Sequence, residues 1–166
     1  ANRWDGPVGM SGGAGGRTAA EEYLGRPMDD TEWEMLARTT YAEATGDPEE
    51  QAAVMSVILN RVKADGYPDS ITEVVNAPNQ FQAVTGTSAN GRQPSSRFKA
   101  FNDEVLAQFE TEVTPRLTNF LDQNWLNFTA GNTAAYGEGT NVDFLDQVNN
   151  SDGSARIGGT VFGTVR

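Results

Sequence analysis

The chain has 166 residues, a length typical of one domain with its own core. It contains neither cysteine nor histidine, which excludes disulfides, Cys–His and Ser–His nucleophile systems, and metal sites built on thiolate or imidazole. A net charge of −11 argues against a nucleic-acid binder, which needs a basic face, and against an anionic membrane surface. No apolar run approaches the roughly 20 residues of a membrane span, so we expect no membrane insertion. Carboxylates are the first candidates for acid–base chemistry, and we expect no cofactor and no metal site.

Residues 1–28 differ from the rest of the chain in their glycine content. Seven of the 18 glycines lie there, and such a stretch cannot fold alone. We therefore predict a flexible Gly-rich arm over residues 1–28 and one domain over residues 29–166. The charges of the arm balance, which suits docking onto a partner; the alternative is an arm folded back on its own domain. No leader with a charged and then an apolar part is visible, so we expect no signal peptide.

Helix signals follow in chain order. Thr31 begins a capping box, and apolar residues recur after it at helical spacing. Asp47 and Pro48 begin a second helix whose residues are apolar on nearly all sides, which is typical of a buried central helix. The remaining expected elements are a short helix over residues 70–76, a small hairpin within residues 83–93, a helix over residues 94–110 and a further helix after residue 115. The predicted fold class is therefore mainly α (α+β with a minor β element).

Glu43 is the carboxylate with the most unusual position in this pattern. It lies one turn from a helix end, next to Ala42 and Ala44, and it precedes a turn at Gly46. A carboxyl in such a place can lose part of its hydration, which raises its pKa toward the range of a general acid. From spacing alone, the alternative that Glu43 is an ordinary solvated helix glutamate stays open.

A longer pattern makes the sequence similar to a known family. Residues 36–48 read LARTTYAEATGDP, residues 51–62 read QAAVMSVILNRV, and further short segments follow as far as residue 84. The pattern resembles the cell-wall hydrolase family of spore-cortex-lytic enzymes, densely over residues 33–84 and more thinly as far as Phe162. This resemblance implies a lysozyme-like α-helical fold that cleaves the MurNAc–GlcNAc bond of its partner substrate, peptidoglycan.

The resemblance also implies a mechanism with one glutamate. Glu43 matches the catalytic glutamate in the family's Tyr-x-Glu-Ala segment. In relatives that act as lytic transglycosylases, this glutamate protonates the leaving glycosidic oxygen and then removes the proton of the MurNAc 6-hydroxyl as an anhydro ring closes. No metal and no second carboxylate take part, unlike the two-carboxylate schemes. Two alternatives stay open: a lysozyme-type hydrolase, and a non-catalytic structural virion protein that retains the fold.

Further residues match family positions beside the cleft. Those that the resemblance assigns to substrate binding are Tyr41, Gln80, Phe81 and Tyr136. Each has a structural alternative, which is a loop amide for Gln80 and core packing for the three aromatic rings. Asn60 and Arg61 match as well, and an interhelical polar bridge accounts for them without any substrate.

The C-terminal part of the sequence departs from the family pattern. Thr160 stands where a histidine is expected, and Gly163 stands where an aromatic residue is expected. These changes bear on the C-terminal side of the cleft and on substrate preference. No leader and no peptidoglycan-binding repeat is seen, so a sporulation role is not carried over. We instead expect a phage enzyme, in the virion or in the host cytoplasm before release to the cell wall, whose residues 1–28 dock a virion or assembly partner.

Overall fold

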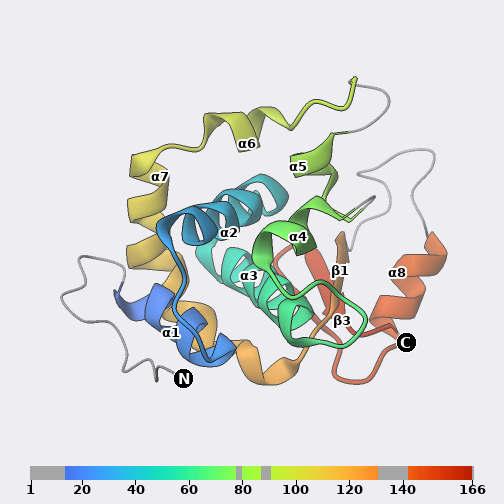
Figure 1. Ribbon diagram of the computed structural model, residues 1–166. Coiled ribbons are helices and arrows are strands. Elements are labelled where there is room, and N and C mark those ends of the chain that lie inside the picture. Colours follow the sequence, from blue (N-terminus) through green and yellow to red (C-terminus); the bar gives the residue numbers. More distant parts are fainter. Residues whose placement is uncertain (1–13, 78–79, 87–90, 131–141, 166) are drawn as a thin grey trace.

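The computed structural model describes residues 14–77, 80–86, 91–130 and 142–165 (Figure 1). Its elements, in chain order, are the helices α1 (Ala14–Leu24), α2 (Asp30–Glu43), α3 (Pro48–Lys63), α4 (Ile71–Asn76), α5 (Gln82–Thr85), α6 (Ser96–Ala100) and α7 (Asp103–Gln108), the π-helix η2 (Phe109–Val113), the 3₁₀ helices η3 (Thr114–Asn119) and η4 (Leu121–Gln123), strand β1 (Asn127–Ala130), helix α8 (Val142–Asn149), and strands β2 (Ala155–Ile157) and β3 (Thr160–Gly163). The mainly α fold with a minor β element is confirmed.

Helix α3 runs through the middle of the molecule, and the other elements surround it (Figure 1). The Asp47 side chain caps it by accepting a 3.0 Å hydrogen bond from the backbone N–H of Glu50, and Pro48 occupies the first turn. Every residue from Glu50 to Val62 is buried. A run of that length passes more than three times around the helix axis, so all sides of α3 are covered. The predicted central helix is confirmed.

Helix α2 begins two residues earlier than the capping box at Thr31 predicts. The side chain of Asp29 accepts the backbone N–H of Glu32 at 2.7 Å and caps the helix. Arg26 pairs with the Glu32 carboxylate at 2.9 Å, which holds the approach to the helix. Asp29 caps the helix in place of Thr31, because an aspartate at the cap offers a charged acceptor to the N–H groups of the first turn. Trp33 then lies on the buried face.

The predicted flexible arm over residues 1–28 is wrong for the part that the structure describes. Helix α1 packs against α3, η2 and η3, and Ala20 and Met28 are buried in the core. The buried Glu21 carboxylate accepts the backbone N–H of Met28 at 2.6 Å, and Arg17 donates to the Met28 carbonyl. The small alanines of α1 let it approach its neighbours closely. The prediction of a flexible arm rests on the glycine content and does not consider these alanines. Residues 1–13 lie outside the described residues.

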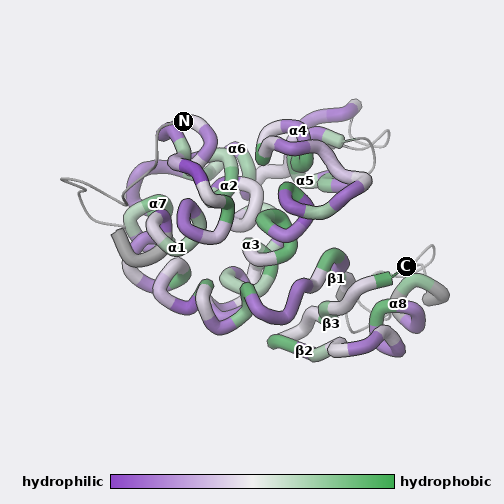
Figure 2. The backbone as a smooth tube through the Cα atoms, turned by 60° about the horizontal axis from the view of Figure 1, so that its bottom comes forward, coloured by the Kyte–Doolittle hydropathy of each residue, from purple (hydrophilic) through white to green (hydrophobic). Residues whose placement is uncertain are grey.

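A three-stranded antiparallel sheet lies at one side of the helices, with α8 beside it (Figure 2). Its strand order is β1-β3-β2, and Phe128 lies opposite Phe162 in the central pairing. Trp125 stacks on Phe162 with ring centroids 5.1 Å apart, which joins the sheet to the apolar core. The minor β element thus comes from the C-terminal part of the chain. The start of the hairpin predicted within residues 83–93 is helix α5 instead, and residues 87–90 lie outside the described residues.

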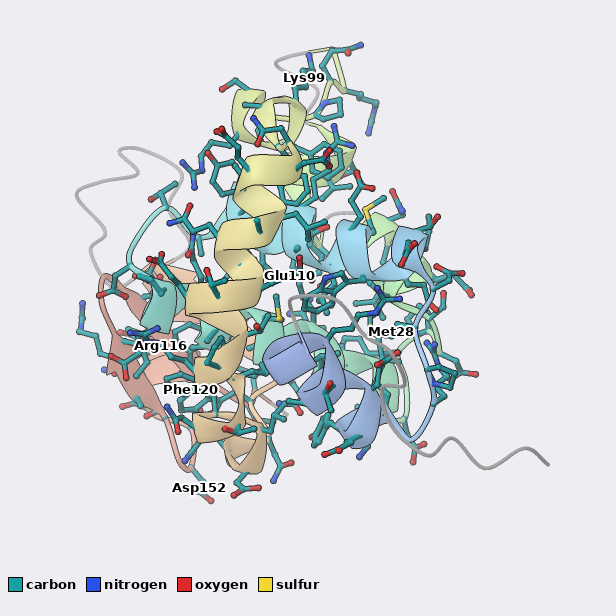
Figure 3. The ribbon with its side chains drawn as sticks, turned by 90° about the vertical axis from the view of Figure 1, so that its left-hand side faces the viewer. Met28, Lys99, Glu110, Arg116, Phe120 and Asp152 are labelled. Atoms are coloured by element: carbon teal, nitrogen blue, oxygen red, sulfur yellow. The ribbon has the colours of Figure 1, made fainter. Side chains whose placement is uncertain are left out.

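The predicted helix over residues 94–110 is divided into pieces. Phe101 and Asn102 have extended backbone, and the Asn102 side chain caps α7 by accepting the N–H of Val105 at 3.0 Å. Side chains such as asparagine favour helix starts over helix interiors, so the helix ends and begins again there. Figure 3 shows α7, η2 and η3 as one column along this face, with Glu110 in the middle and Phe120 below it.

Candidate active site

Glu43 is the last residue of α2, at the turn that leads into α3. Ala44 leaves helical geometry with φ −112° and ψ 111°, and it is buried. Its N–H donates to the Thr40 carbonyl at 2.8 Å, and its own carbonyl accepts the Gln51 side chain at 3.3 Å. A side chain of Arg97 donates to the same carbonyl. The residue after Glu43 is therefore fixed from both helices, which gives the Glu43 carboxyl a defined position.

Burial raises the pKa of Glu43 to about 7. Two neighbours act in the opposite direction, because the backbone N–H of Ala83 in α5 donates to the carboxylate and the Arg61 guanidinium attracts it. Loss of hydration outweighs both of them. The carboxyl is therefore close to half protonated at neutral pH, which suits a group that must first give a proton and then take one.

Arg61 connects Glu43 to the sheet and to the loop before α5. Its Nε donates to the Leu126 carbonyl at 2.8 Å, and its Nη1 donates to the Gln80 side chain at 3.3 Å. The guanidinium also lies 5.2 Å from the ring centre of Phe81. Burial lowers the pKa of Arg61, whereas Tyr67 and Glu43 raise it. Arg61 itself bridges to a loop and to the residue before a strand. The interhelical polar bridge expected at Asn60 and Arg61 is made by Asn60, whose Oδ1 accepts the Tyr23 hydroxyl of α1.

Gln80 and Phe81 have different places in this site. The exposed Gln80 amide is held by Arg61 and lies at the surface. The Phe81 ring is 0% exposed and packs 6.2 Å from the ring of Phe128 in β1. The prediction that Phe81 contacts the substrate is therefore corrected, because its ring belongs to the core. Phe81 positions the loop that carries Gln80 and begins α5.

Tyr41 does not converge with Glu43. Tyr41 and Glu43 are two positions apart, which corresponds to a rotation of about 200° around the helix axis, so their side chains point to opposite sides of α2. The Tyr41 ring lies edge-on to Phe101 and Phe109 at 6.1 and 6.3 Å, and the Arg97 guanidinium covers it at 3.8 Å. The structure thus gives Tyr41 the packing role that was the alternative to substrate binding. Tyr136 lies outside the described residues, and its predicted substrate contact stays a prediction.

The C-terminal departures from the family pattern have a local explanation at Gly163. A Cβ there would lie 2.6 Å from the Val148 carbonyl oxygen and would collide with Ser151 Oγ. Helix α8 and the turn after it fill the space that a larger side chain needs. Thr160 begins β3, is half-buried, and lies opposite Ala130 and Ile157 in the sheet.

Glu110 is a second carboxyl whose pKa burial raises. It lies on η2 near Arg17 and Asp30, where α2 begins. Glu43 lies at the other end of α2, about 20 Å along the helix axis. In the described part of the chain, no group of three metal-ligating side chains is placed to hold a metal ion. No helix within the described ranges is both long and apolar enough to cross a membrane.

Comparison with known proteins assigns this chain to a family. Residues 46–141 match the family described as Cell Wall Hydrolase, and they make up more than half of the chain. The chain belongs to the cell wall hydrolase family. The matched segment of this cell wall hydrolase contains Arg61 and Gln80, and it begins three residues after Glu43.

The relatives of this cell wall hydrolase include larger proteins. A spore cortex-lytic enzyme of Oceanobacillus iheyensis is 35% identical over 79 residues, which are 46% of this chain and 29% of the relative. A spore cortex-lytic enzyme of Bacillus subtilis is 43% identical over 51 residues, or 30% of this chain and 17% of the relative. The aligned segment thus spans less than a third of these relatives.

A solved structure shares the fold of this cell wall hydrolase. It is the catalytic domain of the germination-specific lytic transglycosylase SleB from Bacillus anthracis, with a TM-score of 0.56. The match covers 82% of this chain and 97% of that domain at 21% sequence identity. The lysozyme-like fold expected from the resemblance is confirmed.

Proposed function

We propose that this cell wall hydrolase cleaves the glycan strands of peptidoglycan at the MurNAc–GlcNAc bond by a lytic transglycosylase mechanism with Glu43 as the single catalytic carboxyl. The observation that carries the proposal is the position of Glu43 at a helix end, with a pKa of about 7 and with Arg61 and an N–H group beside it. The names of the relatives and of the structural neighbour support the same substrate class and reaction.

The reaction begins from the protonated form of Glu43. Glu43 gives its proton to the glycosidic oxygen as the bond from that oxygen to C1 of MurNAc breaks. The 6-hydroxyl oxygen of the same MurNAc then bonds to C1, and the Glu43 carboxylate takes the hydroxyl proton. Arg61 and the Ala83 N–H favour the carboxylate that exists between these steps. The cycle returns Glu43 to its starting form without consuming water.

Two acids that follow Glu43 closely in the sequence have structural contacts of their own. Asp47 caps α3, and the buried Glu50 carboxylate accepts the N–H of Gly159 at 3.0 Å. A two-carboxylate mechanism places its second carboxyl roughly 5–10 Å from the first. Within the described residues, the groups that shift the pKa of Glu43 are a peptide N–H and a guanidinium, with no acid among them. This environment favours the transglycosylase over the hydrolase.

Digestion of purified peptidoglycan sacculi followed by mass spectrometry tests the proposal. We expect products with 1,6-anhydro-MurNAc ends, lighter by one water than the products of a hydrolase. Glu43→Gln should release none of them, whereas Glu49→Gln should behave as the wild type because Glu49 is an exposed acid in the first turn of α3. Reducing MurNAc ends would instead establish the lysozyme-type hydrolase. If the wild type releases no products, the alternative that remains is a non-catalytic virion protein that retains the fold.

The phage setting and the docking partner stay predictions of the sequence. Because α1 and Met28 pack into the core, we assign docking to residues 1–13. Deleting residues 1–13 should keep glycan cleavage and remove the protein from purified virus particles. Equal incorporation of the shortened protein would refute the docking role.

A further inference from the structure

Glu50 is a buried carboxylate that the proposed mechanism does not use. It lies in the first turn of α3, where glutamates usually face solvent and interact with the helix dipole. Here its side chain is buried, and Oε2 accepts the backbone N–H of Gly159 at 3.0 Å. This contact joins residues 109 positions apart in the sequence. Glu50 therefore links the start of the central helix to the turn between β2 and β3.

Two glycines enclose the Glu50 carboxylate. A Cβ added at Gly46 would lie 2.7 Å from Oε1 and 2.9 Å from Oε2, distances that Cβ atoms do not adopt. A Cβ added at Gly158 would collide with Oε2 as well. Gly46 belongs to the turn that follows Glu43, and Gly158 belongs to the β2–β3 turn. The carboxylate thus fills the contact between these two turns.

A second link to the sheet lies on the same side of α3. Eleven residues separate Glu50 from Arg61, which returns the side chain to nearly the same helix face about 16 Å further along the axis. Arg61 holds the Leu126 carbonyl just before β1, as Glu50 holds the N–H of Gly159 just before β3. The sheet is therefore attached to α3 at two separate points, and Glu43 interacts with one of them.

We infer that Glu50 is a positioning residue for the proposed transglycosylase reaction. Its carboxylate holds the Gly46 turn against the β2–β3 turn, and this contact sets the place of Glu43 relative to the sheet. The inference rests on the proposed function, because positioning matters only if Glu43 reacts. Glu50 acts through the turn, and its hydrogen bond rather than its charge is what the arrangement needs.

Steady-state kinetics on soluble, uncrosslinked glycan strands tests the positioning role. Glu50→Ala should lower kcat by about 10- to 100-fold, the loss expected when a catalytic group moves by an ångström, and should leave KM within about twofold. Glu50→Gln should restore most of kcat, because its amide oxygen can still accept the Gly159 N–H. Leu117→Ala is the matched control, since it removes a buried side chain of η3 and destabilises the fold without touching either turn.

A double-mutant cycle on thermal unfolding tests the contact without any activity. Gly46→Ala should lower Tm in the wild type, because the new Cβ meets the Glu50 carboxylate, which can move aside only by giving up its buried place and its bond to the Gly159 N–H. In the Glu50→Ala background the same change should leave Tm unchanged or slightly raised, since alanine has less conformational freedom to lose than glycine. Gly159→Ala is the control, because its Cβ would meet nothing within 4 Å and should show no such coupling.

The outcomes separate this inference from the proposed function. An equal Tm loss for Gly46→Ala in both backgrounds would overturn the contact. A kcat for Glu50→Ala no lower than that of Leu117→Ala, or an effect on KM alone, would overturn the positioning role. A wild type that forms no products, with the Tm coupling intact, would refute the proposed function and the positioning role while leaving the structural link established.

Discussion

Glu43→Gln should affect activity and stability in opposite directions. The substitution keeps the size of the side chain and removes the transferable proton. Positioned proton transfer contributes about 10²- to 10⁴-fold to rate, so lysis of sacculi should fall at least that far. Stability should rise at alkaline pH, because a neutral amide does not pay the cost of holding a half-buried carboxylate with a pKa near 7.

The size and sign of the stability effect follow from that pKa. The pKa of Glu43 rises from 4.5 to about 7 on folding, and each unit corresponds to about 1.36 kcal/mol. The folded state favours the protonated carboxyl, so the wild type is fully stabilised below pH 4.5 and loses stability as pH rises through about 7. At pH 8 the loss reaches at most about 3 kcal/mol, which corresponds to a Tm several degrees higher for Glu43→Gln.

Thermal melts of both proteins at pH 5 and pH 8, together with turbidity assays on sacculi, measure these effects. The difference in Tm should be small at pH 5 and should widen toward pH 8. The same difference at both pH values would show that the carboxyl is not desolvated. Lysis by Glu43→Gln at a rate near that of the wild type would remove Glu43 from the mechanism.

Further predictions follow from the same site and from α1. Activity should fall about tenfold per pH unit above pH 7, because Glu43 must begin protonated; a limb near pH 4.5 in the kcat/KM profile would contradict its desolvation. Arg61→Gln should move this limb to higher pH, since the guanidinium lowers the pKa of Glu43; a shift to lower pH would show that Arg61 acts mainly by excluding water. Deleting residues 1–28 should lower Tm strongly, whereas deleting residues 1–13 should leave α1 and Tm in place; similar melts for the two truncations would contradict the packing of α1.

The central helices could be predicted from the sequence because their signals are local. The cap at Asp47 and the all-round apolar pattern of α3 specify that element without knowledge of its neighbours. Glu43 is singled out mainly by the surrounding motif, because its place at a helix end leaves an ordinary solvated glutamate open, and its catalytic role stays a prediction. The buried Glu50 and the packed α1 could not be found, because both depend on partners far along the chain. A glutamate in a first helical turn looks ordinary in the sequence, and only the folded structure shows that Glu50 contacts Gly159. In the same way, the alanines of a Gly-rich segment look ordinary until the structure shows α1 packed against η3.

The attachment of the sheet to α3 also has a consequence for how the chain reaches its native state. Asn60, Arg61 and Glu50 reach partners that are 65, 65 and 109 residues later. Contacts between such distant segments form slowly, because a long stretch of chain must first close into a loop. During synthesis on a ribosome, the central helix is made before residues near Gly159, so Glu50 lacks its partner until those residues follow. The core therefore stays incomplete until β2 and β3 have been made, and the polar contacts between α3 and the sheet form only after that.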